Sequence, residues 1–146
     1  MTPDDQKIVI ALDRFGREFV VPARDGGIIK FDAGIACADR TVPPEAGLEV
    51  RRICADYAVV AALPEPVKAS IRRLLVLSLN ASLYYLLEEL SNESRNQKLR
   101  LVLDGVDLYK ASYDVYWPGL EGGLFTDQGW LARFSRYGEY GDAAVE

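Results

Sequence analysis

The most apolar stretch of the sequence, Leu74 to Leu87, places the strongest constraint on what this chain can fold into. It belongs to a segment from Pro66 to about Leu90 that begins amphipathic and then becomes apolar on nearly every side. A helix of this kind must be covered all round. The stretch has 14 residues, Ser78, Asn80 and Ser82 among them, whereas a membrane span needs about 20 apolar residues. We therefore expect no membrane span, but a helix that is the central spine of the fold or partly an interface between copies of the chain.

Ser78 and Ser82 are four residues apart and share one face of this helix. Small side chains at this spacing allow a neighbouring helix to approach closely. Alternatively, their hydroxyls bond back to the carbonyls one turn earlier, and this second interpretation is the one we favour.

Three short runs near the N-terminus are rich in β-branched and aromatic residues: Ile8–Leu12, Phe19–Val21 and Ile28–Phe31. The tetrapeptides Asp13–Gly16 and Arg24–Gly27 separate them. Glycine accepts the positive φ that a tight hairpin requires. These residues predict a three-stranded antiparallel meander.

Two helices are expected to follow the meander. The segment from Val42 to Leu63 carries apolar residues at helical spacing. Pro64 and Pro66 interrupt the chain before the long helix begins. The two segments therefore predict a helical hairpin.

The C-terminal part of the chain begins with the alternating run Leu99–Leu103, which predicts a strand, and Asp104-Gly105, which predicts a turn. The residues from Val106 to Trp117 match helical spacing but are also rich in aromatics that favour strands, and we favour a second strand. Asp127 is a candidate N-cap for a last short helix that contains Trp130. This part of the chain therefore predicts a β-ribbon followed by a short helix.

The predicted fold is a single α+β domain over residues 1–146. It combines an N-terminal antiparallel β-meander, a helical hairpin with a long apolar central helix, and a C-terminal β-ribbon plus a short helix.

Composition excludes much of the usual enzyme chemistry. The chain has no histidine, so neither a Ser-His nor a Cys-His pair can form a nucleophile. Gly-rich phosphate-binding patterns and closely spaced cysteine pairs are also absent from the sequence. We therefore expect no cofactor and no metal. We expect Cys37 and Cys54 to be free thiols, as in proteins of a reducing compartment, with a single disulfide between them as the alternative.

Charge and aromatic residues are concentrated at the C-terminal end. Residues 104–146 hold 8 acids and 3 bases, which accounts for the entire net charge of −5, and they hold 9 of the 15 aromatic residues. Tyr and Trp dominate interface hot spots, and negative charge speeds the encounter with a basic partner. The negative charge also argues against nucleic-acid binding.

We therefore expect a non-enzymatic protein-binding domain, of the inhibitor, immunity-type or adaptor kind, that binds a protein surface presenting Arg or Lys. The acidic N-terminus lacks the features of a secretory signal, so a cytoplasmic location is expected. The candidate contact residues are Asp107, Tyr109, Tyr113, Asp114, Tyr116, Trp117, Glu121 and Tyr137.

Two alternative functions remain open. The first is a structural subunit of a homo-oligomeric or virion-type assembly, in which the Leu74–Leu87 helix packs against copies of itself. The second is a small-molecule binder or a carboxylate-based enzyme. Paired carboxylates can carry out glycoside hydrolysis, and Asp104 and Asp107, three residues apart, are the candidate pair.

Overall fold

The computed structural model describes residues 2–91, 100–115, 119–138 and 140–141, and these residues are predominantly helical. Within them the only sheet is an antiparallel pair of two-residue strands, β1 (Val102–Leu103) and β2 (Val106–Asp107). The prediction of a balanced α+β fold was therefore wrong.

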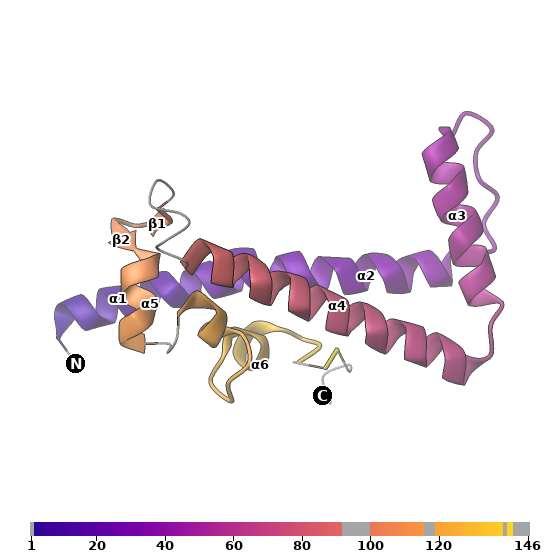
Figure 1. Ribbon diagram of the computed structural model, residues 1–146. Helices are drawn as coiled ribbons and strands as arrows, with labels where there is room; N and C mark the ends of the chain where they lie inside the picture. The colour runs from indigo at the N-terminus through magenta and orange to yellow at the C-terminus, as the bar shows by residue number, and fades with distance from the viewer. Residues whose placement is uncertain (1, 92–99, 116–118, 139, 142–146) are drawn as a thin grey trace.

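The N-terminal meander does not form, because residues 3–36 build one continuous helical rod instead (Figure 1). The rod consists of α1 (Pro3–Phe15), a π-helical turn η1 (Gly16–Val20) and α2 (Val21–Ala36). The chain enters α1 through a capping box. The Thr2 hydroxyl accepts a hydrogen bond from the Asp5 N–H, and the Asp5 carboxylate accepts one from the Thr2 N–H. Hydrogen bonds from Thr2, the backbone one first, lower the pKa of Asp5.

Two of the three glycines in the predicted hairpin turns, Gly16 and Gly27, are instead places where a side chain packs against the rod. A Cβ at Gly16 would lie 2.3 Å from ring atoms of Trp130, and one at Gly27 would lie 2.9 Å from Leu79 Cδ1. Neither glycine has a positive φ. These glycines therefore allow a side chain from another helix to approach the backbone of the rod closely. The sequence pattern alone does not distinguish this role from that of a turn.

The π-helical turn also explains how the rod tolerates Pro22. The Val21 N–H donates to the carbonyl of Gly16, five residues earlier. Pro22 then falls in the first turn of α2, where the missing N–H of proline is tolerated. The rod therefore continues through a residue that would break an ordinary helix.

The long helix predicted from Pro66 to about Leu90 is confirmed as α4 (Glu65–Ser91), which runs antiparallel to α2 (Figure 1). The predicted Val42–Leu63 helix is confirmed over a shorter span, as α3 (Leu48–Ala61). However, α3 stands off from the end of the rod (Figure 1), and none of its residues is buried. It packs on α2, which is also the neighbour of α4, so the two predicted helices do not form a closely packed hairpin.

The Asp104-Gly105 turn is confirmed, with φ values of 52° and 77°. The second strand ends at Asp107, however, and the chain continues as α5 (Leu108–Val115). The prediction of a strand as far as Trp117 was wrong over α5, because the Asp107 carboxylate accepts a hydrogen bond from the Lys110 N–H and starts a helix there.

A 3₁₀ turn, η2 (Leu120–Gly123), and a short helix, α6 (Trp130–Phe134), follow α5. The short helix containing Trp130 is confirmed, but its N-cap is Gly129 rather than Asp127. These two elements bring the C-terminal part of the chain back against the rod (Figure 1).

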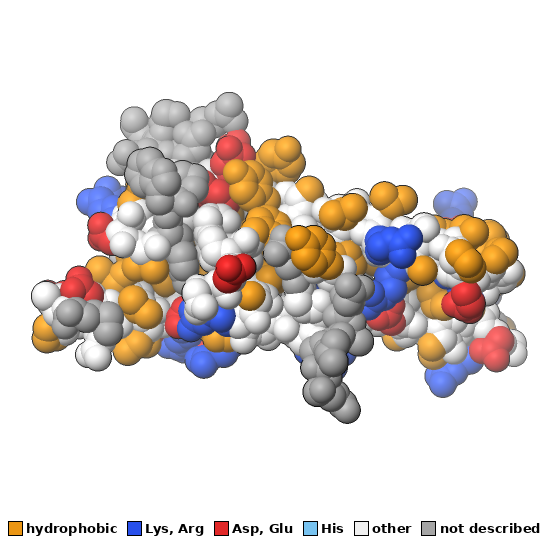
Figure 2. Space-filling view, turned by 90° about the horizontal axis from the view of Figure 1, so that it is seen from below, with side chains coloured by type: hydrophobic (Ala, Val, Ile, Leu, Met, Phe, Trp, Pro, Cys, Tyr) orange, Lys and Arg blue, Asp and Glu red, His pale blue; other side chains and the backbone are white. Residues whose placement is uncertain are grey.

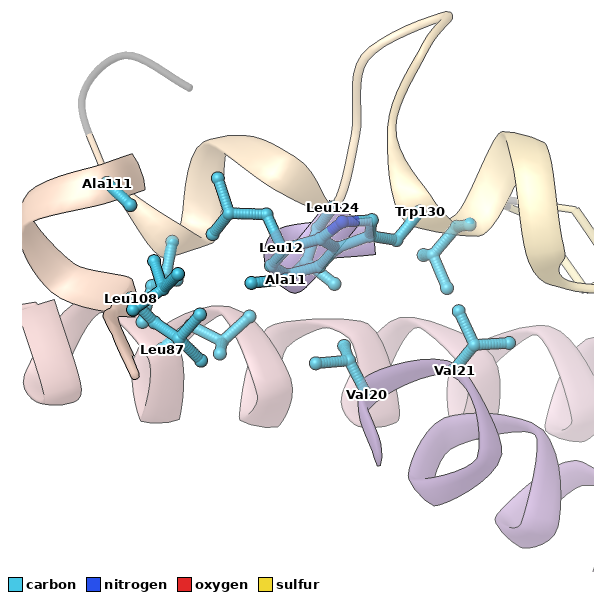
Figure 3. Close-up of a cluster of buried hydrophobic side chains, with 12 residues drawn as sticks. Ala11, Leu12, Val20, Val21, Leu87, Leu108, Ala111, Leu124 and Trp130 are labelled. Carbon is cyan, nitrogen blue, oxygen red and sulfur yellow. The ribbon is translucent and has the colours of Figure 1, made fainter. Parts of the chain in front are cut away.

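The hydrophobic core lies where α1, η1, α4, α5, η2 and α6 meet, and Trp130 is at its centre (Figure 3). The Trp130 side chain is completely buried and meets the ring of Phe15 edge-on at 5.7 Å. Other buried side chains surround it, among them Leu12, Leu87 and Leu124. The core is therefore concentrated at one end of an elongated molecule.

Gly16→Ala should destabilise the protein by about 1–3 kcal/mol, because the added methyl group overpacks the site against the Trp130 ring. Gly26→Ala is the matched control, because a Cβ there meets nothing within 4 Å, and it should stabilise the helix by about 0.5–1 kcal/mol. Urea unfolding followed by circular dichroism measures both. Equal effects of the two substitutions would contradict the assigned role of Gly16.

Candidate protein-binding surfaces

The helix α5 places two of the predicted contact tyrosines on the surface. Its inner side is anchored in the core by Leu108, Ala111 and Ser112, which are all buried. Because an α-helix completes one turn every 3.6 residues, the side that carries Tyr113 and the neighbouring Asp114 points away from this anchor, and the half-buried Tyr109 lies at its edge. Residues near the end of the rod, in α1, form the support beneath α5 (Figure 1).

Tyr109 and Tyr113 form a ring pair on this outer side. Their ring centroids are 5.1 Å apart at an interplanar angle of 74°, and their hydroxyl oxygens are 3.5 Å apart. This edge-to-face arrangement is one that aromatic pairs prefer. Tyr113 is 40% exposed, and Asp114 beside it is exposed. The outer face of α5 therefore presents aromatic surface next to a carboxylate.

Two other acids of the C-terminal part are engaged by arginines. Asp104 accepts a hydrogen bond from Arg14 at 2.7 Å, and Asp107 lies 3.6 Å from Arg100. Hydrogen bonds to Glu18 and then to Asp104 raise the pKa of Arg14. The excess of acid along the C-terminal sequence is thus partly neutralised in space by basic residues from the rest of the chain.

The remaining predicted contact residues lie elsewhere. Glu121, in η2, is buried, and its Oε2 has no hydrogen-bond partner among the described residues. Tyr137 lies against the guanidinium groups of Arg72 and Arg136, at 5.7 Å and 4.8 Å from its ring centroid. Tyr116 and Trp117 lie outside the described residues. The structure therefore gathers Asp107, Tyr109, Tyr113 and Asp114 at α5 and separates Tyr137 from them.

A second surface runs along the outer side of α4. Leu74, Leu77 and Tyr85 are exposed by 63%, 57% and 63%, and the exposed Ala81 lies between them at helical spacing. On the opposite side, Val76 and Leu87 are buried. Among the described residues, the helix that the sequence required to be covered all round is therefore covered on one side only, and hydrophobic side chains are visible at the surface along the molecule (Figure 2).

We call this exposed line of residues the α4 stripe. Its members follow one another at intervals of three or four residues and are all exposed. They are Val67, Ser70, Leu74, Leu77, Ala81, Tyr85 and Glu88.

A buried polar network holds the inner side of α4 against α2. The fully buried Arg24 donates from Nε to Asn80 Oδ1 and from Nη1 to Asp25 Oδ1, each at 3.1 Å. Its Nη1 also donates to Ser135 Oγ, and the Ser135 hydroxyl donates to the Asp25 carboxylate at 2.9 Å. Because Asn80 is fixed inward by this network, the residues on the opposite side of α4 face outward.

The described residues include no group of three or more acidic or cysteine side chains that could hold a metal ion. Cys37 and Cys54 are free thiols. None of the described helices combines the length and the apolar character that a membrane crossing requires.

No protein-family model, curated protein or solved structure matches this chain.

Arg24→Met should destabilise the protein by about 3–5 kcal/mol, because it leaves the Asp25 carboxylate buried without its cation. Arg14→Met is the control. It also removes a paired arginine, but one whose side chain is 43% exposed, and exposed ion pairs contribute little. Thermal and urea unfolding of the two variants measure the difference. A loss at Arg24 no larger than that at Arg14 would show that the buried network does not hold α4 in place.

Proposed function

We propose that this chain is a non-enzymatic protein-binding domain, and that it recognises a basic partner through the outer face of α5. The observation that carries the proposal is the ring pair of the half-buried Tyr109 and the exposed Tyr113 beside the exposed Asp114, on a helix whose other side is fixed in the core. Rings held in this way lose little conformational freedom on binding.

The chemistry of this face fits an Arg or Lys side chain of the partner. A cation that lies over a tyrosine ring gains about 0.5–2 kcal/mol, depending on how far it is removed from water. The Asp114 carboxylate can pair with the same or a neighbouring cation. Charge complementarity of this kind raises the association rate more than it raises the affinity itself.

The test uses arrayed short peptides rich in Arg and Lys, with otherwise identical Gln-substituted peptides as the neutral reference. Wild-type protein should bind the basic peptides in a salt-sensitive manner. Tyr113→Ala should weaken binding by about 5- to 30-fold, because it removes ring surface at the centre of the site. Asp114→Lys should mainly slow association, which surface plasmon resonance measures.

Asp127→Lys is the matched control for Asp114→Lys. It makes the same change of charge at an exposed residue of the segment before α6, and it should leave association almost unchanged. If the two charge reversals slow association equally, the basic peptides respond to net charge alone, and α5 is not the site. If Tyr113→Ala binds like the wild type, the tyrosine pair has no part in recognition.

A further inference from the structure

We infer that the α4 stripe is a self-association surface, on which a second copy of the chain packs its own α4 in the antiparallel direction, with the two-fold axis at Ala81. The inference goes beyond the proposed function, because it concerns another surface and another partner. It starts from the exposure of the stripe, whose larger apolar members, Leu74, Leu77 and Tyr85, each leave more than half of their surface uncovered.

The part of the stripe from Leu74 to Glu88 is arranged symmetrically about Ala81. Leu77 and Tyr85 lie four residues before and after it, and Leu74 and Glu88 lie seven residues before and after it. In an antiparallel pair, a residue before the centre in one copy lies level with the residue equally far after the centre in the other. Leu77 therefore meets Tyr85 of the second copy, and this contact occurs twice because a two-fold interface uses the same patch on both copies.

Charge complementarity selects the antiparallel direction. Arg73 lies beside the N-terminal half of the stripe and Glu88 ends its C-terminal half, and both are exposed. They are eight and seven residues from Ala81. The antiparallel arrangement places Arg73 of each copy near Glu88 of the other, at both ends of the contact. A parallel arrangement would place arginine beside arginine and glutamate beside glutamate, which is repulsive.

The centre of the stripe permits close contact between the two helices. Ala81 has only a methyl side chain, and Ser78 beside it is also small and exposed. Helices pack at an interaxial distance of 8–10 Å that depends on the side chains at the contact. The small residues at the centre allow the short end of this range, with Leu77 and Tyr85 filling the space on either side. From Leu74 to Glu88, the part that the two copies share is about 21 Å long at 1.5 Å per residue.

The described part of the chain leaves this face open for a structural reason. Arg24 holds Asn80 on the inner side of α4, and Gly27 lets Leu79 approach the backbone of α2. Both contacts fix the rotation of α4, so the opposite face cannot turn inward without breaking them.

The first test is the mass of the full chain in solution, measured by analytical ultracentrifugation from about 1 to 200 µM. We expect a concentration-dependent species of twice the chain mass of 16.2 kDa. Ala81→Glu should abolish it, because two carboxylates would then meet at the axis. Val59→Glu, at a 66% exposed residue of α3 outside the stripe, should leave it intact. Circular dichroism confirms that each variant is folded.

The second test is a charge exchange that depends on the direction of the two helices. Arg73→Glu and Glu88→Arg should each weaken the dimer by about 5- to 10-fold, because each places like charges together at both ends. The double variant should return to within about 3-fold of the wild type, because the pairs are restored in reverse. An additive loss in the double variant would overturn the antiparallel arrangement.

Thiol cross-linking locates the axis. In a chain with Cys37→Ser and Cys54→Ser, Ala81→Cys should give a covalent dimer with a short bis-maleimide, whereas Leu74→Cys should not, because Leu74 lies far from its own copy. Equal cross-linking at both residues would indicate a parallel pair and contradict the inference.

A chain that stays monomeric at 200 µM would overturn the inference and leave the stripe to a different protein or to a lipid surface. This outcome can be separated from failure of the proposed function. Tyr113→Ala and Asp114→Lys change α5 only, so they should leave the dimer unaffected, and Ala81→Glu should leave the binding of basic peptides unaffected.

Discussion

The contact between Trp130 and the helical rod holds the rest of the structure in place. The ring lies where Gly16 and Gly123 leave no side chain in its way, and it meets Phe15 edge-on. One buried indole thereby joins α6, η2 and the junction between α1 and α2, which are far apart in the sequence. Aromatic rings of this size contribute much of the burial in a small core, and here the core lies mainly around this one.

Away from that core, polar contacts maintain the alignment of α2 and α4. Arg24 reaches Asn80, and Arg72 binds both oxygens of Asp32 at 2.8 and 2.9 Å. Few apolar side chains are buried in this half of the molecule, Ile28 and Val76 among them. An elongated shape of this kind buries a smaller share of its surface than a sphere, which is why so many large apolar side chains remain exposed on α3 and α4.

Elements that depend on local signals could be predicted from the sequence. The long apolar run identified α4, Asp104-Gly105 identified the turn, and Trp130 lies in the expected short helix. The meander failed because Gly16 and Gly27 serve as packing positions, which requires knowledge of residues more than fifty positions away. The capping box at Thr2 was a local sign of a helix that outweighs the β-branched runs after it.

The candidate site shows the same division between local and distant information. The outward direction of Tyr113, and the position of Tyr109 one turn before it, follow from helical spacing once α5 is known to be a helix. The pairing of Asp104 with Arg14 could not be predicted, because it joins residues 90 positions apart. Counting charges along the chain therefore overstated how acidic the folded surface is.

The π-helical turn at Gly16–Val20 has a consequence for how this protein can change during evolution. Each residue advances a helix by about 100°, and a π turn holds one residue more than an ordinary turn. Losing that residue would restore regular hydrogen bonding but would rotate α1 relative to α2. Leu12 would then point away from its neighbours in the core, while Arg24 would keep its hydrogen-bond partners. Insertions and deletions should therefore be tolerated in the 38–47 connection long before they are tolerated inside the rod.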